Sequence, residues 1–210
     1  MIASPLAWDE SSAKAHWRNR KSNQPFFSVF NFNVTHESKL WKNYFFDSVE
    51  SSVVELPPIF PNDLLIKNDF IVNYSNIEKL DKQIGKIIDQ LKQDGLYNNT
   101  IIFFFSDHGG PFPRYKRSIY DTGIHCPLII KWANQFVGKR NDQLISFIDF
   151  APTILEVTDT KNKFPFEGVS FYKKNQRNYI FASSDRFDEF ADARRLSLIH
   201  ISEPTRPLSI

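Results

Sequence analysis

The chain has 210 residues, 41% of them hydrophobic, and a formal net charge of +2 from 26 basic and 24 acidic residues. This length and apolar fraction suffice for one sizeable domain with a buried core. The balanced charge argues against a nucleic-acid-binding protein. No stretch is long and apolar enough to span a membrane, and the single cysteine, Cys126, excludes an internal disulfide.

The first aromatic segment lies between residues 25 and 32. Residues 1–24 are polar and irregular and predict a lead-in without regular structure. Pro25 then opens a run of aromatic and β-branched residues, which predicts a strand over residues 25–32, ended by Asn33. His36 follows at the exit of this strand, where α/β folds place residues that contact ligands. His36 is therefore a candidate ligand-contacting residue.

A loop and a long helix follow. Three prolines, Pro57, Pro58 and Pro61, predict a loop across the surface. Apolar residues then recur every three or four positions, which predicts an amphipathic helix. The helix is expected to end at Asp94-Gly95, because glycine tolerates the left-handed conformation that often follows a helix. The recurring residues are Ile77, Leu80, Ile84, Ile87, Ile88 and Leu91.

Two apolar runs after the helix predict core strands. Residues 100–105 form an uninterrupted run that is typical of a strand buried on both faces of a parallel sheet. A helix, a short turn and a buried strand make half of a βαβ unit. Residues 127–132 predict another core strand. The middle of the chain therefore indicates an α/β fold.

The rest of the chain predicts shorter elements and a separate tail. Residues 144–146 predict a short strand, and residues 149–157 predict a helix. Asp149 lies near the start of this helix, where a carboxylate accepts hydrogen bonds from unpaired backbone amides. Residues 179–182 predict a last strand. Residues 196–210 resemble read-through translation of a sequencing adapter, so they are excluded from the fold prediction.

The candidate chemistry begins at Asp107-His108, directly after the predicted strand over residues 100–105. Two glycines, Gly109 and Gly110, follow and let the backbone turn tightly beside a ligand. Aspartate supplies a hard oxygen ligand, and histidine binds a metal or positions an anion. The pair therefore predicts a ligand site at the strand exit. For this tripeptide alone, the alternative is a turn with a capping aspartate and a surface histidine.

Lys116 and Cys126 follow on the next loop. The ammonium group of Lys116 is a compact charge with three donors, which suits an anionic oxygen on a transferred group. Taken alone, Lys116 would be interpreted as a solvated surface lysine. Cys126 precedes Pro127 at the start of an apolar run. This position favours a buried structural cysteine over a nucleophile.

Several segments keep a fixed order along the chain. The amphipathic helix is followed by the strand that ends in Ser106-Asp107-His108-Gly109, then by Lys116 and by the segment leading into Pro127. In this order they resemble the sulfatase family of the alkaline-phosphatase superfamily. The resemblance extends from about residue 25 to residue 195, and its other segments are residues 25–36, 120–130, 146–155 and 166–171.

The resemblance implies a fold and a division of the chain. The implied fold is α/β, part of an alkaline-phosphatase-like sandwich in which helices flank a mixed, mostly parallel sheet, with the N-terminal portion missing. Residues 1–24 would be an irregular lead-in. Residues 25–195 would be the C-terminal part of a sulfatase catalytic domain, and residues 196–210 a non-native read-through tail.

The resemblance also implies roles for four residues. Asp107 and His108 fall where the family binds its divalent cation, usually Ca²⁺. Lys116 and His36 fall where the family binds the sulfate and assists the departure of the leaving oxygen, so both are candidate catalytic and substrate-binding residues. Because calcium prefers oxygen ligands, three alternatives stay open for His108: direct ligation, a position behind the ligands, or a different metal.

The nucleophile is expected outside the chain. In the family it is a formylglycine made from Cys or Ser in a Cys/Ser-x-Pro-x-Arg motif that precedes the segment starting near Pro25, and the chain is interpreted as lacking such a motif. The aspartate pair that completes the metal site is expected there too. One aspartate and one histidine cannot fill a calcium shell of about six to eight ligands. The isolated chain is therefore expected to bind metal weakly and to turn over nothing.

Finer resemblance points to the heparan N-sulfatase-like group, through residues 16–20, 35–38, 110–114 and 185–189. It implies a sulfated sugar or glycan as the substrate. Asp185, Arg186 and Asp188 would shape the glycan subsite, with Arg186 as the candidate substrate-binding residue; the alternative is a solvated charged turn. No nucleic acid is expected as a partner. The resemblance implies a periplasmic, extracellular or lysosomal enzyme.

Two other functions stay open. A phosphodiesterase or phosphonate hydrolase of the same superfamily shares the Asp-His-Gly corner, and the residue at the nucleophile position would distinguish it from a sulfatase. The other alternative is an inactive fragment that performs no catalysis.

Overall fold

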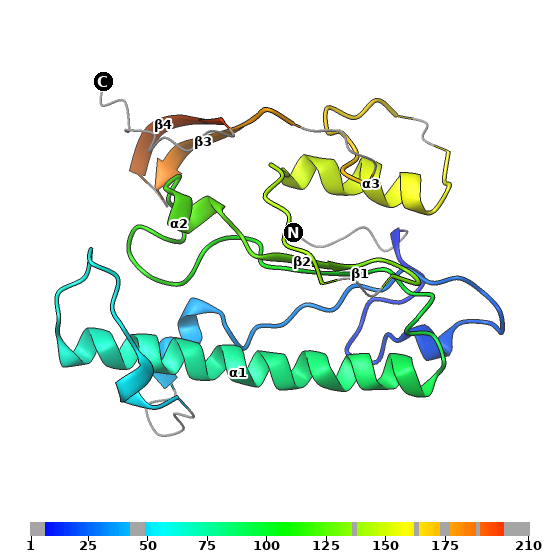
Figure 1. Cartoon of the computed structure of the whole chain (residues 1–210), viewed down its shortest axis with the longest axis horizontal. Helices are drawn as coiled ribbons and strands as arrows, with labels where there is room; N and C mark the ends of the chain where they lie inside the picture. Colours follow the sequence, from blue (N-terminus) through cyan, green and yellow to red (C-terminus); the bar gives the residue numbers. More distant parts are fainter. Residues whose placement is uncertain are drawn as a thin grey trace. The chain divides into compact units, whose positions relative to one another are not determined.

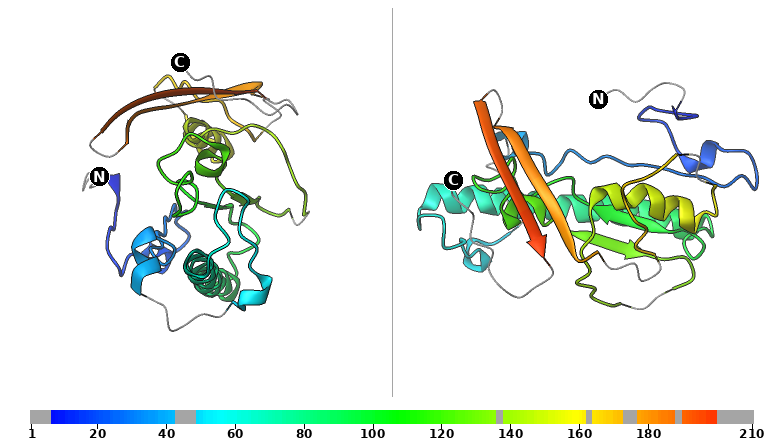
Figure 2. Two further views of the ribbon diagram at one scale, coloured as in Figure 1. Left: turned by 90° about the vertical axis from the view of Figure 1, so that its left-hand side faces the viewer. Right: turned by 90° about the horizontal axis from the view of Figure 1, so that it is seen from above.

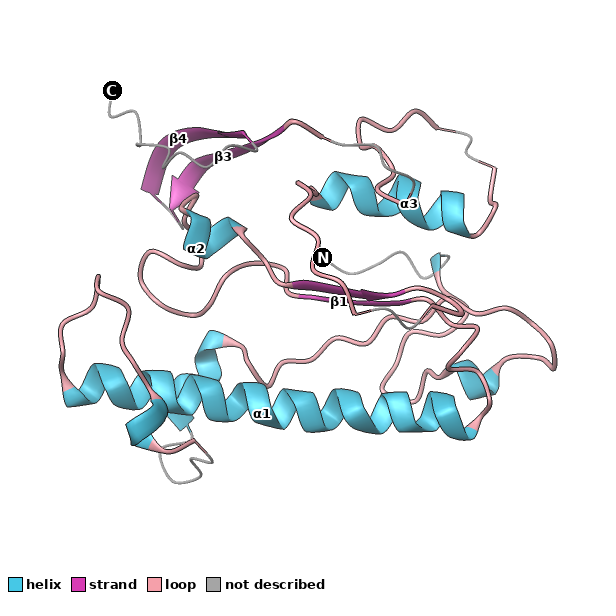
Figure 3. Ribbon diagram, viewed as in Figure 1, coloured by secondary structure: helices cyan, strands magenta, loops and turns pink. Residues whose placement is uncertain are grey.

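The computed structural model describes residues 7–42, 49–135, 138–161, 164–172, 177–187 and 190–199. The chain divides into two compact units inside its long helix α1 (Leu64–Gln93), between Gln83 and Ile84. Figure 1 traces the chain, and Figure 3 marks its helices and strands.

The described part of the first unit combines residues 64–83 of α1 with long loops and three short 3-10 helices. These are η2 (Trp17–Asn19), η3 (Glu37–Lys42) and η4 (Ser51–Val53). Trp17 is 2% exposed, stacks on Phe26 with ring centroids 5.9 Å apart, and meets Phe30 edge-on at 5.8 Å. The buried apolar residues of this unit are Trp17, Leu40, Val54, Phe70, Ile71 and Val72.

The segment predicted as a strand over residues 25–32 forms a loop (Figure 3), so this prediction was wrong. Phe27, Val29 and Phe30 are 62%, 53% and 37% exposed. A high β-propensity describes side chains that fit a half-buried pleated surface, but a strand also needs a neighbouring strand for its backbone. In the described part of the chain, the aromatic side chains of this segment pack on Trp17 without such a neighbour.

The predicted helix is confirmed and is longer than its pattern indicated, with 30 residues. It begins after Asp63, whose carboxylate accepts a hydrogen bond from the Leu65 amide at 2.7 Å. The sequence pattern missed the first turns because buried residues there are consecutive, as in residues 70–72. The helix ends as predicted: Gly95 has φ +69°, and the Leu96 amide donates to the Leu91 carbonyl at 2.9 Å.

The second unit contains the two predicted core strands, β1 (Ile102–Phe105) and β2 (Leu128–Lys131). They pair antiparallel, with Ile102 opposite Lys131 and Phe105 opposite Leu128. This corrects the parallel arrangement inferred from the apolar run at residues 100–105. An apolar run carries no information on the direction of strand pairing. Direction depends on the connection, and residues 106–127 return the chain through a loop whose helix, α2 (Asp121–Ile124), is a single turn, too short for the helical crossover that usually joins parallel strands.

An aromatic cluster joins this strand pair to the predicted helix α3 (Phe150–Val157), which is confirmed. The ring centroid of Phe150 lies 4.9 Å from that of Phe105, 6.0 Å from that of Phe103 and 5.7 Å from that of Phe171. Aromatic pairs at these separations add stabilisation beyond the area they bury. The phenylalanines of β1 thus take part in this cluster, but the predicted burial on both faces was wrong, because Phe105 is 43% exposed and the rest of β1 is half-buried.

Asp149, just before α3, accepts a hydrogen bond from an unpaired backbone amide as predicted, but in a capping box of the 3-10 helix η5 (Phe147–Asp149) that leads into α3. Its carboxylate makes no capping hydrogen bond to α3. It accepts hydrogen bonds from the Ser146 amide at 2.8 Å and the Val169 amide at 2.9 Å, and it forms an ion pair with Arg177. The strand predicted over residues 144–146 is reduced to one isolated bridge, between Leu144 and Arg177. Asp149 thus ties three separate segments together.

The last strand prediction is confirmed and extended. β3 (Tyr179–Phe187) pairs antiparallel with β4 (Phe190–Ile199), with an irregularity between Ser184 and Arg186. Figure 2 shows these two strands from two further directions. Leu196 pairs with Ala182, so the predicted start of the tail lies inside β4. The read-through origin of residues 196–210 stays a prediction, and residues 200–210 lie outside the described residues.

Candidate active site

The loop between β1 and β2 carries three of the predicted site residues, Asp107, His108 and Lys116. At its base, the Ser106 amide donates to the Pro127 carbonyl at 3.4 Å. The Ser106 hydroxyl donates to the His108 carbonyl. Both contacts begin at the residue that leaves β1, so the Asp-His pair is fixed at the end of a core strand. This is the position that the sequence predicted.

Two glycines bring the two halves of the loop into backbone contact. The Gly109 amide donates to the Gly123 carbonyl at 2.9 Å. A Cβ on Gly109 would lie 1.9 Å from the Thr122 carbonyl oxygen, and one on Gly123 would lie 2.2 Å from the Ser118 carbonyl oxygen. No side chain fits at either distance. The close approach of the backbones therefore requires glycine at both positions.

Asp107 and His108 hold a geometry that fits a shared cation. The His108 Nδ1 lies 2.7 Å from the Gly109 carbonyl oxygen, so it carries the proton and leaves Nε2 with a free lone pair. Nε2 lies 3.6 Å from the Asp107 Oδ1. Adjacent ligands at about 2.4 Å from one cation are about 3.4 Å apart. The Asp107 carboxylate is 87% exposed, which leaves its oxygens open to a metal.

These two residues do not make a complete metal site. Within the described residues, no group of three or more His, Cys, Asp or Glu side chains could hold a metal ion. A calcium shell takes about six to eight oxygen ligands. Asp107 and His108 are therefore candidate ligands that would fill at most two positions of such a shell.

Lys116 lies on the same loop, tied to the Asp-His-Gly segment by its backbone. Its amide donates to the Gly110 carbonyl at 3.0 Å, and its side chain is half-buried. Arg114 and Arg117 flank it with φ values of 70° and 65°, in the left-handed region that non-glycine residues rarely adopt. Such strain concentrates where loops are shaped for a ligand. The same loop therefore carries the Lys116 ammonium group and, a few residues earlier in the sequence, the candidate metal ligands Asp107 and His108.

Cys126 lies at the end of this loop and is half-buried. Burial raises the pKa of its thiol, and the nearby Asp107 charge raises it further, while a hydrogen bond with Ser106 lowers it. The reactive form of cysteine is the thiolate, which a raised pKa disfavours. This environment supports the prediction that Cys126 is structural and not the nucleophile.

His36 lies in the first unit, whereas Asp107, His108 and Lys116 lie in the second. Its amide donates to the Asn33 carbonyl at 3.2 Å, and its Nδ1 lies 3.0 Å from the Ser38 hydroxyl. The ring is exposed. His36 thus ends a turn that begins at Asn33, and its Nδ1 is held by a local partner.

The segment predicted to shape a glycan subsite lies on β3. Asp185 forms an ion pair with Arg195 of β4 at 2.5 Å, and the Arg186 side chain is exposed. Asp188 lies outside the described residues. The substrate-binding role of Arg186 stays a prediction.

Two segments of the sequence, around Trp17 and around Ser202, need a different interpretation from the predicted one. Trp17 belongs to residues 16–20, one of the segments that resemble the heparan N-sulfatase-like group. Its side chain is buried in the core, so its presence is explained by packing and needs no ligand. Ser202, Pro204 and Arg206 match the Ser-x-Pro-x-Arg spacing, which the sequence reasoning missed. They follow Asp107 where the family motif precedes it, and they lie outside the described residues.

Comparison with known proteins finds a matching family model and several similar proteins. The Sulfatase family model matches residues 9–160. The ulvan-active sulfatase of Formosa agariphila is 43% identical over 229 residues, covering 90% of this chain and 38% of that protein. Human N-sulphoglucosamine sulphohydrolase is 28% identical over 110 residues, covering 49% of this chain and 21% of that protein. The chain thus spans 38% and 21% of the lengths of these relatives.

A solved structure supports the fold. A phosphonate monoester hydrolase from Silicibacter pomeroyi superimposes with a TM-score of 0.55 and 24% identity, covering 70% of this chain and 38% of that one. This likeness confirms the predicted α/β, alkaline-phosphatase-like fold class. No helix in the described part of the chain is long and apolar enough to cross a membrane.

Proposed function

The chain belongs to the sulfatase family, and on that premise we propose that it supplies the C-terminal part of the catalytic domain of an enzyme that hydrolyses sulfate esters on a sulfated sugar. The observation that carries this proposal is the Asp107-His108 pair, with Nε2 and Oδ1 3.6 Å apart at the end of β1. Two ligand atoms so placed suit one divalent cation, Ca²⁺ by the family resemblance.

Asp107 and His108 would hold this cation together with ligands from outside the chain. A bound divalent cation polarises the oxygens of the group being transferred. The carbonyl of Gly109 fixes the His108 ring so that Nε2 faces Asp107. The nucleophile, a formylglycine in the family, would also come from outside residues 25–195.

Lys116 would stabilise the charge that develops on the sulfuryl oxygens. Its ammonium group carries three donors and a full positive charge. A donor placed at developing negative charge commonly contributes about 10²–10³ in kcat. Lys116 follows the candidate cation ligands on one loop whose halves are joined through Gly109 and Gly123, which supports this role.

His36 would act on the leaving oxygen of the sugar. An imidazole donates a proton near neutral pH, which suits a leaving alkoxide. Its Nδ1 is engaged by Ser38, so Nε2 is the nitrogen directed to a substrate.

The substrate is proposed to be a sulfated polysaccharide. The 43% identity to an ulvan-active sulfatase covers most of this chain, whereas the 28% identity to N-sulphoglucosamine sulphohydrolase covers half of it. This difference favours an ulvan-like polymer over heparan. A polymer does not cross membranes, so the predicted location outside the cytoplasm fits this substrate.

Sulfate release from candidate substrates by the complete enzyme tests the proposal. We expect sulfate release from an aryl sulfate and from ulvan oligosaccharides, abolished by a chelator and restored by Ca²⁺. Hydrolysis of a phosphonate monoester in preference to both would instead favour the phosphonate hydrolase alternative, which the fold of the Silicibacter pomeroyi enzyme keeps open.

Replacement of Lys116 tests its role separately. Lys116→Ala should lower kcat for the aryl sulfate by about 10²-fold or more, because an electrostatic donor is lost at the reacting group. Lys139→Ala, at an exposed position of the same unit, is the matched control and should leave kcat unchanged. Equal turnover by both variants would remove Lys116 from the site.

A further inference from the structure

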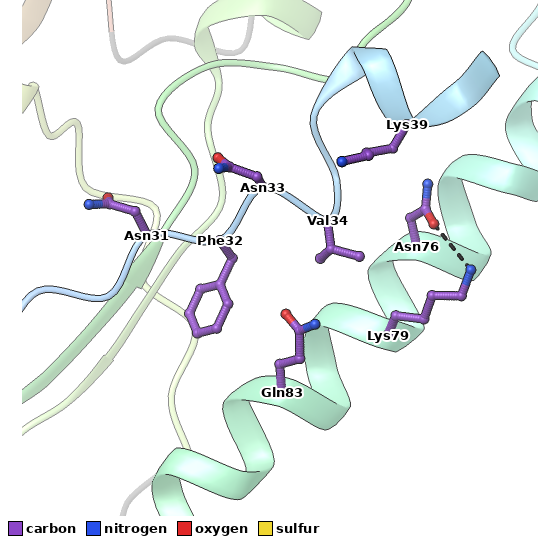
Figure 4. A pocket seen from close by; sticks show the side chains of 8 residues that line it. All are labelled: Asn31, Phe32, Asn33, Val34, Lys39, Asn76, Lys79 and Gln83. Carbon is purple, nitrogen blue, oxygen red and sulfur yellow. Dashed lines mark hydrogen bonds between the residues drawn. The ribbon is translucent and has the colours of Figure 1, made fainter. Parts of the chain in front are cut away.

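A polar pocket lies in the first unit, between residues 31–39 and helix α1. It has a volume of about 420 Å³, within the range of small-molecule sites. The segment before η3 supplies one wall, and Asn76, Lys79 and Gln83 of α1 supply the other (Figure 4). The eight lining residues are Asn31, Phe32, Asn33, Val34, Lys39, Asn76, Lys79 and Gln83.

The pocket lining is rich in hydrogen-bond donors and carries no acidic side chain. Two lysines and four amide side chains line the pocket, and none of the eight lining residues is acidic. Asn76 is 1% exposed, and its Oδ1 accepts a hydrogen bond from the Lys79 ammonium at 3.4 Å (Figure 4). A buried amide therefore orients one of the two positive charges. Ammonium and amide donors together suit an anionic oxygen.

The pocket also offers apolar surface. Figure 4 shows Phe32 and Val34 projecting toward α1, from which Gln83 projects back toward them. Ligand sites commonly combine such apolar surface with a few polar groups that fix orientation. A sugar ring has apolar C–H faces and polar edges, so one anionic sugar unit matches both parts of the lining.

We propose that this pocket binds an anionic group, a sulfate or a carboxylate, on a sugar unit near the one whose sulfate is cleaved. The pocket and His36 share one turn, since the His36 amide donates to the carbonyl of the lining residue Asn33 at 3.2 Å. The choice of a glycan as the source of the anion rests on the proposed function. The pocket would thereby select polyanionic chains over single sulfated sugars.

Two adjacent substitutions on α1 give a matched test in the complete enzyme. Gln83→Glu and Lys82→Gln each lower the net charge by one at exposed positions, but only Gln83 lines the pocket. We expect Gln83→Glu to weaken binding of a sulfated ulvan oligosaccharide by about 10-fold at low salt, through repulsion of the anion. Lys82→Gln should change it less than about 2-fold. Equal effects of the two variants would overturn the proposal.

A second variant, Lys39→Gln with Lys79→Gln, removes both ammonium groups while keeping the side-chain stems. Its affinity for the same oligosaccharide should fall by about 10-fold or more, with a smaller loss as salt rises. Unchanged affinity would overturn the proposal. A thermal unfolding midpoint equal to that of the unsubstituted enzyme verifies folding, and the Gln83→Glu comparison decides the matter where the double variant unfolds.

The source of the anion is distinguished with two further probes. A desulfated oligosaccharide that keeps its uronate carboxylates reports carboxylate binding, and inorganic sulfate reports the sulfate group alone. Pocket-dependent binding without any sulfate release by the unsubstituted enzyme would contradict the proposed function and leave the pocket assignment intact. Sulfate release with pocket-independent binding would contradict the pocket assignment alone.

Discussion

At the scale of single residues, Asp107 and Asp149 show how burial decides the use of one side chain. The Asp107 carboxylate is 87% exposed, and its neighbour His108 supplies a nitrogen 3.6 Å away. The Asp149 carboxylate is 2% exposed and is fully engaged by Arg177 and two backbone amides. An exposed carboxylate without other partners can bind a cation. A buried carboxylate whose oxygens already accept hydrogen bonds links the segments that donate them.

Removing the Asp149 carboxylate should be strongly destabilising. Asp149→Ala leaves Arg177, 20% exposed, without its partner, and we expect the free energy of unfolding to fall by about 3–5 kcal/mol. Asp142→Ala is the control, because Asp142 pairs with Arg140 in solvent, with both side chains more than 70% exposed. It should cost less than about 1 kcal/mol. Similar losses in urea unfolding of the two variants would contradict the assigned role of Asp149.

The Cys126 thiol should be slow to react. Burial and the Asp107 charge raise its pKa above the ordinary value of 9.0, so less thiolate is present than in an unfolded chain. Alkylation by iodoacetamide in metal-free buffer at about pH 8 should therefore be slower for the folded than for the urea-unfolded protein. The folded state retains its proton above pH 9.0, so stability should fall as the pH rises through the raised pKa. Faster alkylation of the folded protein would refute this assignment.

At the scale of elements, α1 and the loop over residues 106–127 depend on different kinds of information. The helix follows from a periodic pattern with local start and stop signals at Asp63 and Gly95. The loop depends on contacts between residues 14 positions apart, such as Gly109 and Gly123. Local patterns predict the helix, and only the folded backbone explains why both of these loop positions need glycine.

Glycine substitutions at these two elements should have opposite signs. Gly85→Ala, where an added Cβ meets nothing within 4 Å, should raise the free energy of unfolding by about 0.5–1 kcal/mol by improving helix propensity. Gly109→Ala forces its Cβ against the Thr122 carbonyl oxygen and should lower both stability and turnover in the complete enzyme. Thermal unfolding of the two variants measures the difference. A neutral Gly109→Ala would show that the loop is not packed as described.

At the scale of the whole molecule, the candidate site residues are distributed over both units. His36 belongs to the first unit and Asp107, His108 and Lys116 to the second. The chain covers 38% of the length of the ulvan-active sulfatase. Within the described residues, two candidate cation ligands lie together at the end of β1, and a calcium shell needs about six to eight.

The isolated 210-residue chain should therefore turn over no aryl sulfate, and its thermal unfolding midpoint should shift little with millimolar Ca²⁺, because weak binding stabilises little. The test has a specific alternative, since Ser202 to Arg206 match the nucleophile motif by spacing. Turnover that Ser202→Ala abolishes would contradict the prediction and assign the nucleophile to the tail. Sulfate release and differential scanning fluorimetry provide the measurements.

The sequence by itself determined the α/β class, helix α1, the positions of strands β1 and β2, α3 and the position of the Asp-His pair at a strand exit. These depend on periodicity, apolar runs and end signals that neighbouring residues carry. Tertiary structure decided the rest. It set the antiparallel pairing of β1 with β2, left residues 25–32 as a loop, and placed Asp149 against Arg177. It also formed the pocket of Lys39 and Lys79, because pairing direction and burial depend on partners that are distant along the chain.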